Sequence, residues 1–184
     1  MSVQREELVD YVTYERQVRS EILPTVLAAK AKRRIHLGDH LTFLFENDLT
    51  IRYQIQEMMR VEQIVREADI QHEIDTYNEL LGGPGELGCT LLIEIATPEE
   101  RAEKLRAWLG LPEYLYLEVE GGERVKASYD ARQIGTERLS SVQYLKFDTK
   151  GRSPVALGVD HPALKARTEL SAAQRAALTA DLED

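Results

Sequence analysis

The chain has 184 residues and carries 32 acidic side chains against 23 lysines and arginines, a formal net charge of −9. Such a surplus of acid argues against a dedicated nucleic-acid binder, because neutralising phosphates takes an excess of Lys and Arg. No run approaches the roughly 18 apolar residues of a membrane span. The length indicates one domain with a core large enough to fold without disulfides or a metal.

The first part of the chain predicts helices, because apolar residues recur there at helical spacing. The expected elements are helices over 5–33, 49–71 and 72–81, with an extended segment over 35–46. Pro24 should kink the first helix or begin a second one, since proline removes a backbone donor. Asn47 or Asp48 can cap the second long helix. The run Gly82-Gly83-Pro84-Gly85 then breaks the helical pattern.

Beyond this break the apolar period changes to that of strands. Strands are expected over 88–96, 114–120, 124–130, 142–148 and 154–159. A helix should follow the capping box formed by Thr97 and Glu100, and a terminal helix should follow the one formed by Ser171 and Gln174. We predict one α+β domain in which long N-terminal helices pack against a mainly antiparallel sheet of about five to six strands. It is mainly helical over 1–81, mainly strands over 86–160, and ends in a helix within 161–184.

One hairpin can be predicted to its register. A three-residue loop, Gly121–Glu123, would place Val119 opposite Val125 and Leu117 opposite Ala127. A two-residue loop would instead place apolar side chains opposite charged ones. Because register follows the pairing that keeps one face apolar, the longer loop is predicted.

Cysteine usage and the N-terminus bear on the compartment. The chain opens with residues too polar for the apolar core of a signal peptide. Its single cysteine, Cys89, cannot form an internal disulfide and belongs to no CxxC pair. Cys89 shares a strand face with Leu91 and Ile93, which favours a small buried hydrophobe over a reactive thiol. Both features favour the cytoplasm.

Two polar residues fall within the apolar stripe of the second long helix. At 100° per residue from Ile51, Glu62 lies at about 20° and Gln54 at about −60°, among the apolar side chains. A carboxylate buried in such a stripe is costly unless it is paired, hydrogen-bonded, protonated or metal-bound. Glu62 and Gln54 are therefore candidate catalytic residues, but a satisfied ion-pair network between helices is the favoured explanation, and a more exposed helix is a third.

The first helix shows the same feature. Glu15 and Arg19 fall within its apolar stripe, one turn apart. They could pair with each other or cross to Glu62 and Arg66 if the two helices pack together. Glu15 and Arg19 join the candidate catalytic residues, with a buried interhelical ion-pair network as the structural alternative.

Three residues are candidate metal ligands. His36 and His40 stand four apart across Gly38, and Glu46 follows nearby. Imidazole and carboxylate ligands suit zinc or non-haem iron. Two loosely spaced histidines form a weak signal, however, and ordinary surface or hydrogen-bonded histidines are the alternative. No cofactor is required by the sequence.

A run of cations, residues 30–34, follows the first helix. Arg33 and Arg34 within it are candidate anion-binding residues. The alternative is that these cations simply complement the dipole at the helix C-terminus.

Several motifs together resemble a known family. They are Lys32-Arg33-Arg34-Ile35-His36-Leu37-Gly38, Leu41-Thr42-Phe43, Phe45-Glu46-Asn47, Gln54-Ile55-Gln56-Glu57-Met58 through Arg60-Val61-Glu62, and the triplet Tyr14-Glu15-Arg16. The chain resembles a bacterial family of uncharacterised proteins catalogued as a domain of unknown function. Its members are often encoded beside rubrerythrin-like and iron–sulfur oxidoreductase proteins, so the resemblance implies a role near peroxide handling or electron transfer. The chain lacks the Glu-x-x-His pairs of a di-iron bundle and the cysteines of an iron–sulfur cluster.

These observations leave three hypotheses. The first is an accessory or interaction protein of a cytoplasmic redox or peroxide-stress system, with a redox protein as partner. The second is a metal- or small-molecule-binding enzyme whose polar site gathers Glu62, Gln54, Glu46 and one or both of His36 and His40. The third is an anion-binding module that uses Arg33 and Arg34. Whether the protein is an enzyme, and its oligomeric state, stay open; neither nucleic acid nor a membrane is an expected partner.

Overall fold

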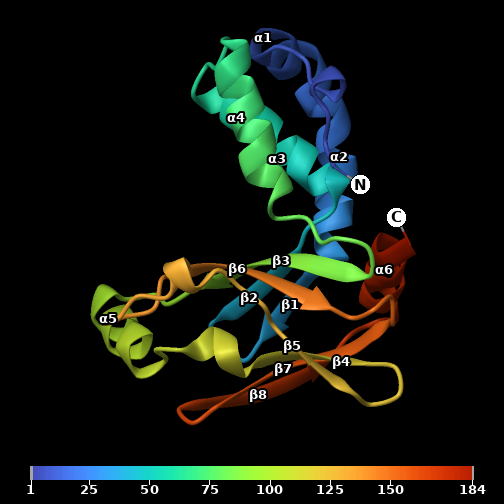
Figure 1. Ribbon diagram of the computed structural model, residues 1–184. Coiled ribbons are helices and arrows are strands. Elements are labelled where there is room, and N and C mark those ends of the chain that lie inside the picture. The colour runs from blue at the N-terminus through green and yellow to red at the C-terminus, as the bar shows by residue number, and fades with distance from the viewer. Residues whose placement is uncertain (1, 184) are drawn as a thin grey trace.

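The computed structural model describes residues 2–183, in which helices and strands largely separate along the chain. The helices are α1 (Tyr11–Thr13), a π-helical turn (Tyr14–Val18), α2 (Arg19–Ala31), α3 (Asp48–Val61), α4 (Glu67–Asn78), α5 (Pro98–Ala107) and α6 (Ala172–Glu183). The strands are β1 (Arg34–Leu37), β2 (Leu41–Phe45), β3 (Glu86–Ile93), β4 (Leu115–Val119), β5 (Arg124–Lys126), β6 (Val142–Asp148), β7 (Pro154–His161) and β8 (Leu164–Glu169). The α+β class is confirmed (Figure 1).

The strands form two antiparallel sheets that pack face to face (Figure 1). Sheet A has the order β1-β2-β3-β6 and sheet B the order β5-β4-β7-β8. Alternate residues of each strand point into the space between the sheets, as the period of a strand requires. Phe43, Phe45, Leu91, Leu117 and Leu157 are among these fully buried side chains. Two four-stranded sheets thus replace the expected single sheet of five to six strands.

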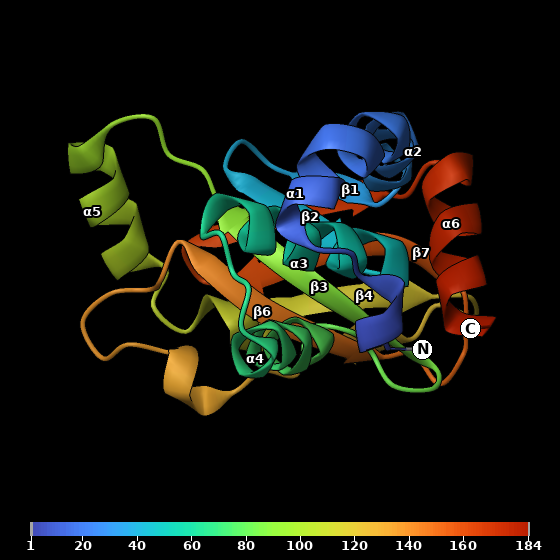
Figure 2. The same cartoon turned by 90° about the horizontal axis from the view of Figure 1, so that it is seen from above.

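Two helices close the ends of this sandwich. Figure 2 shows α5 beside one end of sheet A and α6 beside the other. Leu105 of α5 and Leu178 of α6 belong to the same hydrophobic core as the inward faces of the sheets. Both helices begin where the sequence predicts. Thr97 accepts from the Glu100 amide and caps α5, without the return bond of the predicted capping box, and Ser171 and Gln174 bond reciprocally at the start of α6.

Helices α1 to α4 form a separate unit, here called the helical arm, which stands on the outer face of sheet A (Figure 1). The arm has its own hydrophobic core, distinct from that of the sandwich. The core residues of the arm are Val3, Leu8, Ile51, Ile55, Met59, Ile70, Ile74 and Leu81. At the base of the arm the chain passes over β3, where a Cβ on Gly88 would lie 1.9 Å from the Leu80 carbonyl oxygen. Only glycine at this position lets the arm sit so close to the strand.

The predicted helix over 49–71 is wrong in its boundary. Helix α3 ends at Val61 because Gln63 takes a left-handed conformation, with φ of 53°. The Ile64 amide donates to the Met59 carbonyl at 3.0 Å and the Gln63 amide to the Arg60 carbonyl at 3.4 Å. This is the Schellman arrangement that ends many helices, usually with glycine where Gln63 stands. Without that glycine the sequence carries no stop signal, and α4 begins anew at Glu67.

The first helix also differs from its prediction. It begins at Tyr11, where the Asp10 side chain accepts hydrogen bonds from two backbone amides, and Pro24 lies inside α2 without ending it. The π-helical turn over Tyr14–Val18 inserts an extra residue into one turn. The side chains after this turn are therefore rotated away from the positions that a helical wheel of 100° per residue gives them. Tyr14 is fully buried, whereas Glu15, expected in the stripe, is exposed.

The predicted β4–β5 hairpin has the right faces in the wrong register. Leu117 pairs with Val125, and Glu118 pairs with Arg124, so one face is apolar and the other charged. The expected pairing of Leu117 with Ala127 is displaced by two residues, because the Val119 amide bonds the Glu123 carbonyl and closes the loop earlier. A displacement of two preserves the face of every side chain.

Strand β8, within the region expected to hold only the terminal helix, was not predicted from the sequence. It pairs with β7 in sheet B, and its residues alternate between half-buried and exposed. Among residues 2–183, none of the helices combines the length and the apolar character needed to cross a bilayer.

Candidate functional site

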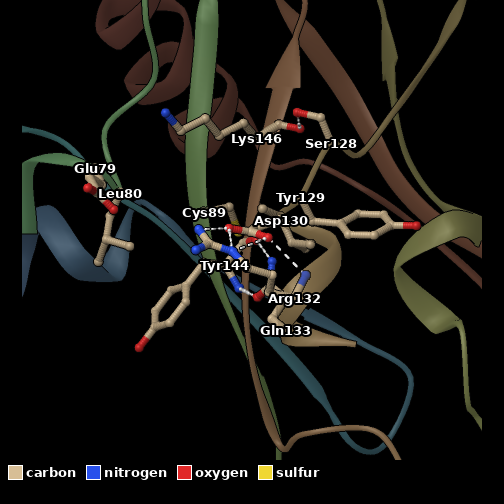
Figure 3. Close-up of a pocket in the computed structure, with 11 residues that line it drawn as sticks. Glu79, Leu80, Cys89, Ser128, Tyr129, Asp130, Arg132, Gln133, Tyr144 and Lys146 are labelled. Carbon is tan, nitrogen blue, oxygen red and sulfur yellow. Dashed lines mark hydrogen bonds and ion pairs between the residues drawn. The ribbon is translucent and has the colours of Figure 1, made fainter. Parts of the chain in front are cut away.

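A ligand-sized hollow, here called the junction pocket, lies where the helical arm meets the edge of sheet A (Figure 3). Its volume is about 620 Å³, within the range of small-molecule sites. Four segments line it: the end of the arm at Glu79 and Leu80, strand β3, strand β6, and the loop over 128–133. The pocket is therefore a product of tertiary structure, since its walls lie far apart in the sequence.

The loop over 128–133 is attached to the free edge of β6. Ser128 and Lys146 exchange two backbone hydrogen bonds, of 2.8 and 2.9 Å. The Gln133 carboxamide then replaces a peptide group: its Nε2 donates to the Tyr144 carbonyl at 2.8 Å, and its Oε1 accepts from the Tyr144 amide at 2.9 Å. An edge strand otherwise presents unpaired backbone groups. These bonds both cover the edge and fix one wall of the pocket.

The alternation of β6 decides which side chains reach the pocket. Leu145 points into the sandwich core, so Tyr144 and Lys146 lie on the outer face, toward the arm. Figure 3 shows Tyr144 and Lys146 extending to the side of β6 on which Glu79 and Leu80 lie, while Tyr129 points the opposite way.

Four charged residues line the pocket, and two of them neutralise each other. The Asp130 carboxylate binds the Arg132 guanidinium through several hydrogen bonds and also accepts from the Arg132 backbone amide. Hydrogen bonds from Arg132 lower the pKa of Asp130 to about 2. Within residues 2–183, the side chains of Glu79 and Lys146 have no hydrogen-bond or ion-pair partner. The pocket thus keeps one carboxylate and one ammonium available.

A second polar cluster lies inside the helical arm and centres on Glu57 of α3. The Glu57 carboxylate accepts from the Tyr14 hydroxyl at 2.9 Å, from Arg19 Nε at 2.8 Å and from Arg60 Nη2 at 3.1 Å. Burial alone would raise the pKa of Glu57, but these three donors lower it to about 2. Burial and the adjoining carboxylate raise the pKa of Tyr14. Glu15 completes the cluster, 3.6 Å from Arg60.

The π-helical turn explains why Tyr14 and Arg19 meet the same carboxylate. Residues five apart lie on different faces of an α-helix, whereas the i→i+5 turn returns the chain to nearly the same face. Of the predicted candidates, Arg19 and Glu15 thus join an ion-pair network that crosses between helices. Their partners are Glu57 and Arg60, rather than the Glu62 and Arg66 that the sequence suggested.

Glu62 lies outside this cluster. It is exposed and follows the last residue of α3, so it does not enter the apolar stripe in which the helical wheel placed it. Gln54 is half-buried beside the Tyr77 phenol. The buried amide of the helix is instead Gln56, whose carboxamide exchanges hydrogen bonds with the Val9 backbone at 2.9 and 3.1 Å. Because the N-terminal segment packs on α3, the buried face extends toward Gln56.

The candidate metal ligands occupy separate places. The His36 ring bonds Thr42 Oγ1 at 3.0 Å, and the His40 ring bonds the Glu94 carbonyl at 3.1 Å. Glu46 lies four residues beyond Thr42, roughly 13 Å along β2. It accepts hydrogen bonds from two threonine hydroxyls, and burial raises its pKa. Over residues 2–183, no three His, Cys, Asp or Glu side chains are arranged to hold a metal ion.

The two candidate anion-binding residues are divided between the interior and the surface. Arg33 is buried and binds Asp181 of α6 through two 2.7 Å hydrogen bonds, and its third nitrogen donates to the Ala29 carbonyl. This pair ties the end of α2 to α6 and leaves Arg33 no free donor edge for an anion. Arg34 is exposed, and its carbonyl accepts from Gln174.

The sequence analysis missed Glu57, Asp181 and the whole junction pocket. Glu57 stands within the family-like motif, but a helical wheel without the π turn gives it no buried partner. The loop over 128–133 carries no recognisable motif, so only the pairing with β6 reveals its position.

The class that the fold defines is an α+β protein built from a two-sheet sandwich and a helical arm. Within that class, this chain belongs to the family described as "Protein of unknown function (DUF3501)", whose family model matches residues 2–182. The resemblance found in the sequence is thereby confirmed.

Among solved structures, the chain is similar to a protein of unknown function from Burkholderia pseudomallei K96243. The two share 31% sequence identity with a TM-score of 0.88, over 99% of this chain and 100% of that one. A search among curated proteins gives no significant match.

Proposed function

We propose that this protein is a non-catalytic accessory protein of a cytoplasmic redox or peroxide-stress system, and that it binds its partner through the far end of the helical arm. The observation that carries the proposal is the apolar character of that end. Val12, Val61 and Val65 are 36, 64 and 69% exposed, although they lie on or beside helices. Exposed apolar side chains that gather in one region commonly mark a protein interface.

The surroundings of these valines suit a protein partner. The adjoining first part of α4, residues 66–73, has one arginine against three acidic residues. Charged groups at the rim of an apolar patch steer association and select the partner. We therefore infer a partner with an apolar centre and a basic rim.

The redox nature of the partner is supported by the family resemblance alone. Neighbouring genes for rubrerythrin-like and iron–sulfur proteins would supply the redox carrier, and this chain would bind it. The arrangement of charged side chains into structural pairs, such as Glu57 with Arg19 and Arg33 with Asp181, is consistent with a binding role.

The test is co-purification and cross-linking of the tagged protein from its native host. The double variant Val61→Ser with Val65→Ser removes the apolar end, and Leu92→Ser, at a 36% exposed position on sheet A, is the matched control. We expect a protein with a flavin, haem or iron–sulfur absorption spectrum to co-purify with the wild type and with Leu92→Ser but not with the double variant. A partner retained by the double variant, or recovery of this chain alone, would contradict the proposal.

A further inference from the structure

We propose that the junction pocket binds a small zwitterionic molecule with an aromatic or aliphatic body, of the class of apolar amino acids and short apolar peptides. This goes beyond the proposed partner binding, because the pocket lies at the base of the arm and the valines at its far end. The proposal depends on three properties of the pocket: its charges, its apolar wall and its fixed shape.

The charges exclude a simple anion or cation as the best ligand. Asp130 and Arg132 satisfy each other, which leaves the Lys146 ammonium and the Glu79 carboxylate. An anion attracted by Lys146 would also meet Glu79, and a cation attracted by Glu79 would meet Lys146. A ligand with one group of each sign satisfies both residues, since each charge then finds its opposite.

The apolar wall determines the body of the ligand. Tyr144 is 48% exposed, and its ring lies on the pocket side of β6, near Leu80 of the arm (Figure 3). An aromatic ring or a branched aliphatic chain would cover this surface and remove it from water. The volume of about 620 Å³ holds a molecule the size of a short peptide as well as a single amino acid.

The wall opposite the arm is held by hydrogen bonds within the protein itself. Gln133 is bonded to both backbone groups of Tyr144, and Ser128 to both of Lys146. The loop therefore has little freedom to lose when a ligand binds, and a preorganised site loses less entropy on binding.

Isothermal titration calorimetry with charge-deleted probes tests the proposal. The probes are L-phenylalanine and the dipeptide leucyl-phenylalanine, each zwitterionic, against N-acetyl-phenylalanine, which lacks the ammonium, and phenylalanine amide, which lacks the carboxylate. We expect the zwitterions to bind about tenfold more tightly than either analogue, the equivalent of one charged hydrogen bond. A tighter dipeptide would identify peptides as the ligand, and a tighter phenylalanine would identify free amino acids.

Variants of the pocket test which residue binds each charged group of the ligand. Lys146→Gln should remove the preference for a carboxylate, so that phenylalanine and its amide bind alike, and Glu79→Gln should remove the preference for an ammonium. Lys32→Gln, just before β1 at the opposite edge of sheet A from β6, and Glu103→Gln in α5 are the matched controls, both at exposed positions. Circular dichroism checks that each variant is folded. The proposal is overturned if no zwitterion binds at millimolar concentration, if the analogues bind as tightly, or if the controls weaken binding as much as the pocket variants.

Discussion

The Glu57 cluster makes a prediction about stability and its dependence on pH. Glu57→Gln removes the carboxylate that three donors share and leaves Arg19 and Arg60 facing a neutral amide. The pKa of Glu57 falls from an ordinary 4.5 to about 2 in the folded protein. Linkage equates a shift of this size with about 3 kcal/mol of folding stability.

Screening by solvent reduces this contribution to the folding stability. The Glu57 side chain is 16% exposed, but Arg19 is 36% exposed, so water and salt screen part of the attraction. We expect Glu57→Gln to be about 1–2 kcal/mol less stable than the wild type near neutral pH. A carboxylate with a lowered folded-state pKa stabilises fully above its unfolded value. The difference between wild type and variant should therefore be constant above about pH 5 and shrink as the pH falls from 4.5 toward 2.

Urea unfolding followed by far-ultraviolet circular dichroism, repeated across that pH range, measures the effect. The matched control is Glu67→Gln, whose carboxylate binds Arg5 at 2.8 Å but is 70% exposed, so this variant should unfold close to the wild type. Equal stability of Glu57→Gln and wild type at neutral pH would refute the reasoning. So would a stability difference that persists unchanged at acid pH, because the loss would then come from packing rather than charge.

Three further predictions concern other parts of the fold. Asp181→Ala leaves Arg33 buried without its partner, and thermal unfolding should show a loss of about 3–5 kcal/mol; an unchanged midpoint would contradict this. Gly88→Ala pushes a Cβ against the Leu80 carbonyl and should cost about 1–3 kcal/mol in urea unfolding, whereas Gly83→Ala, 3.8 Å from its nearest neighbour, should be nearly neutral. The Cys89 thiol is buried, and burial raises its pKa, so it should react with a thiol reagent only after unfolding. Fast labelling of the native protein would show that β3 is accessible.

The sheets illustrate how far local pattern extends. Cys89, Leu91 and Ile93 alternate with polar or more exposed residues, and the structure buries all three on the inner face of sheet A as expected. The side chains of a strand point to its two faces in turn, so the pattern itself contains this information. The division of the strands into two sheets does not follow from any single strand. It depends on which strands pair across long stretches of chain. The residues of β8 alternate regularly, but the inward ones are only half-buried, so the apolar signal of this strand in the sequence is weak.

The Glu57 cluster shows where local pattern is insufficient. The sequence placed Glu15 and Arg19 in an interhelical ion-pair network, and such a network exists, but its centre is Glu57. Two departures from ideal helical geometry account for the difference: the π turn before α2 and the left-handed Gln63 after α3. Neither has a signature in residue type, because each is held by packing within the arm. One extra residue in a turn rotates all that follows by about 100°, which is enough to exchange a buried residue for an exposed one.

By itself, the sequence determined the α+β class, the strand faces, the helix caps at Thr97 and Ser171, and the family to which the chain belongs. These features depend on residues a few positions apart, because the local backbone geometry fixes the direction in which successive side chains point. Only the tertiary structure decided which carboxylate meets which guanidinium, and where the arm and the loop over 128–133 enclose the junction pocket. Those contacts join residues tens of positions apart, and their geometry is set by the packing of whole elements.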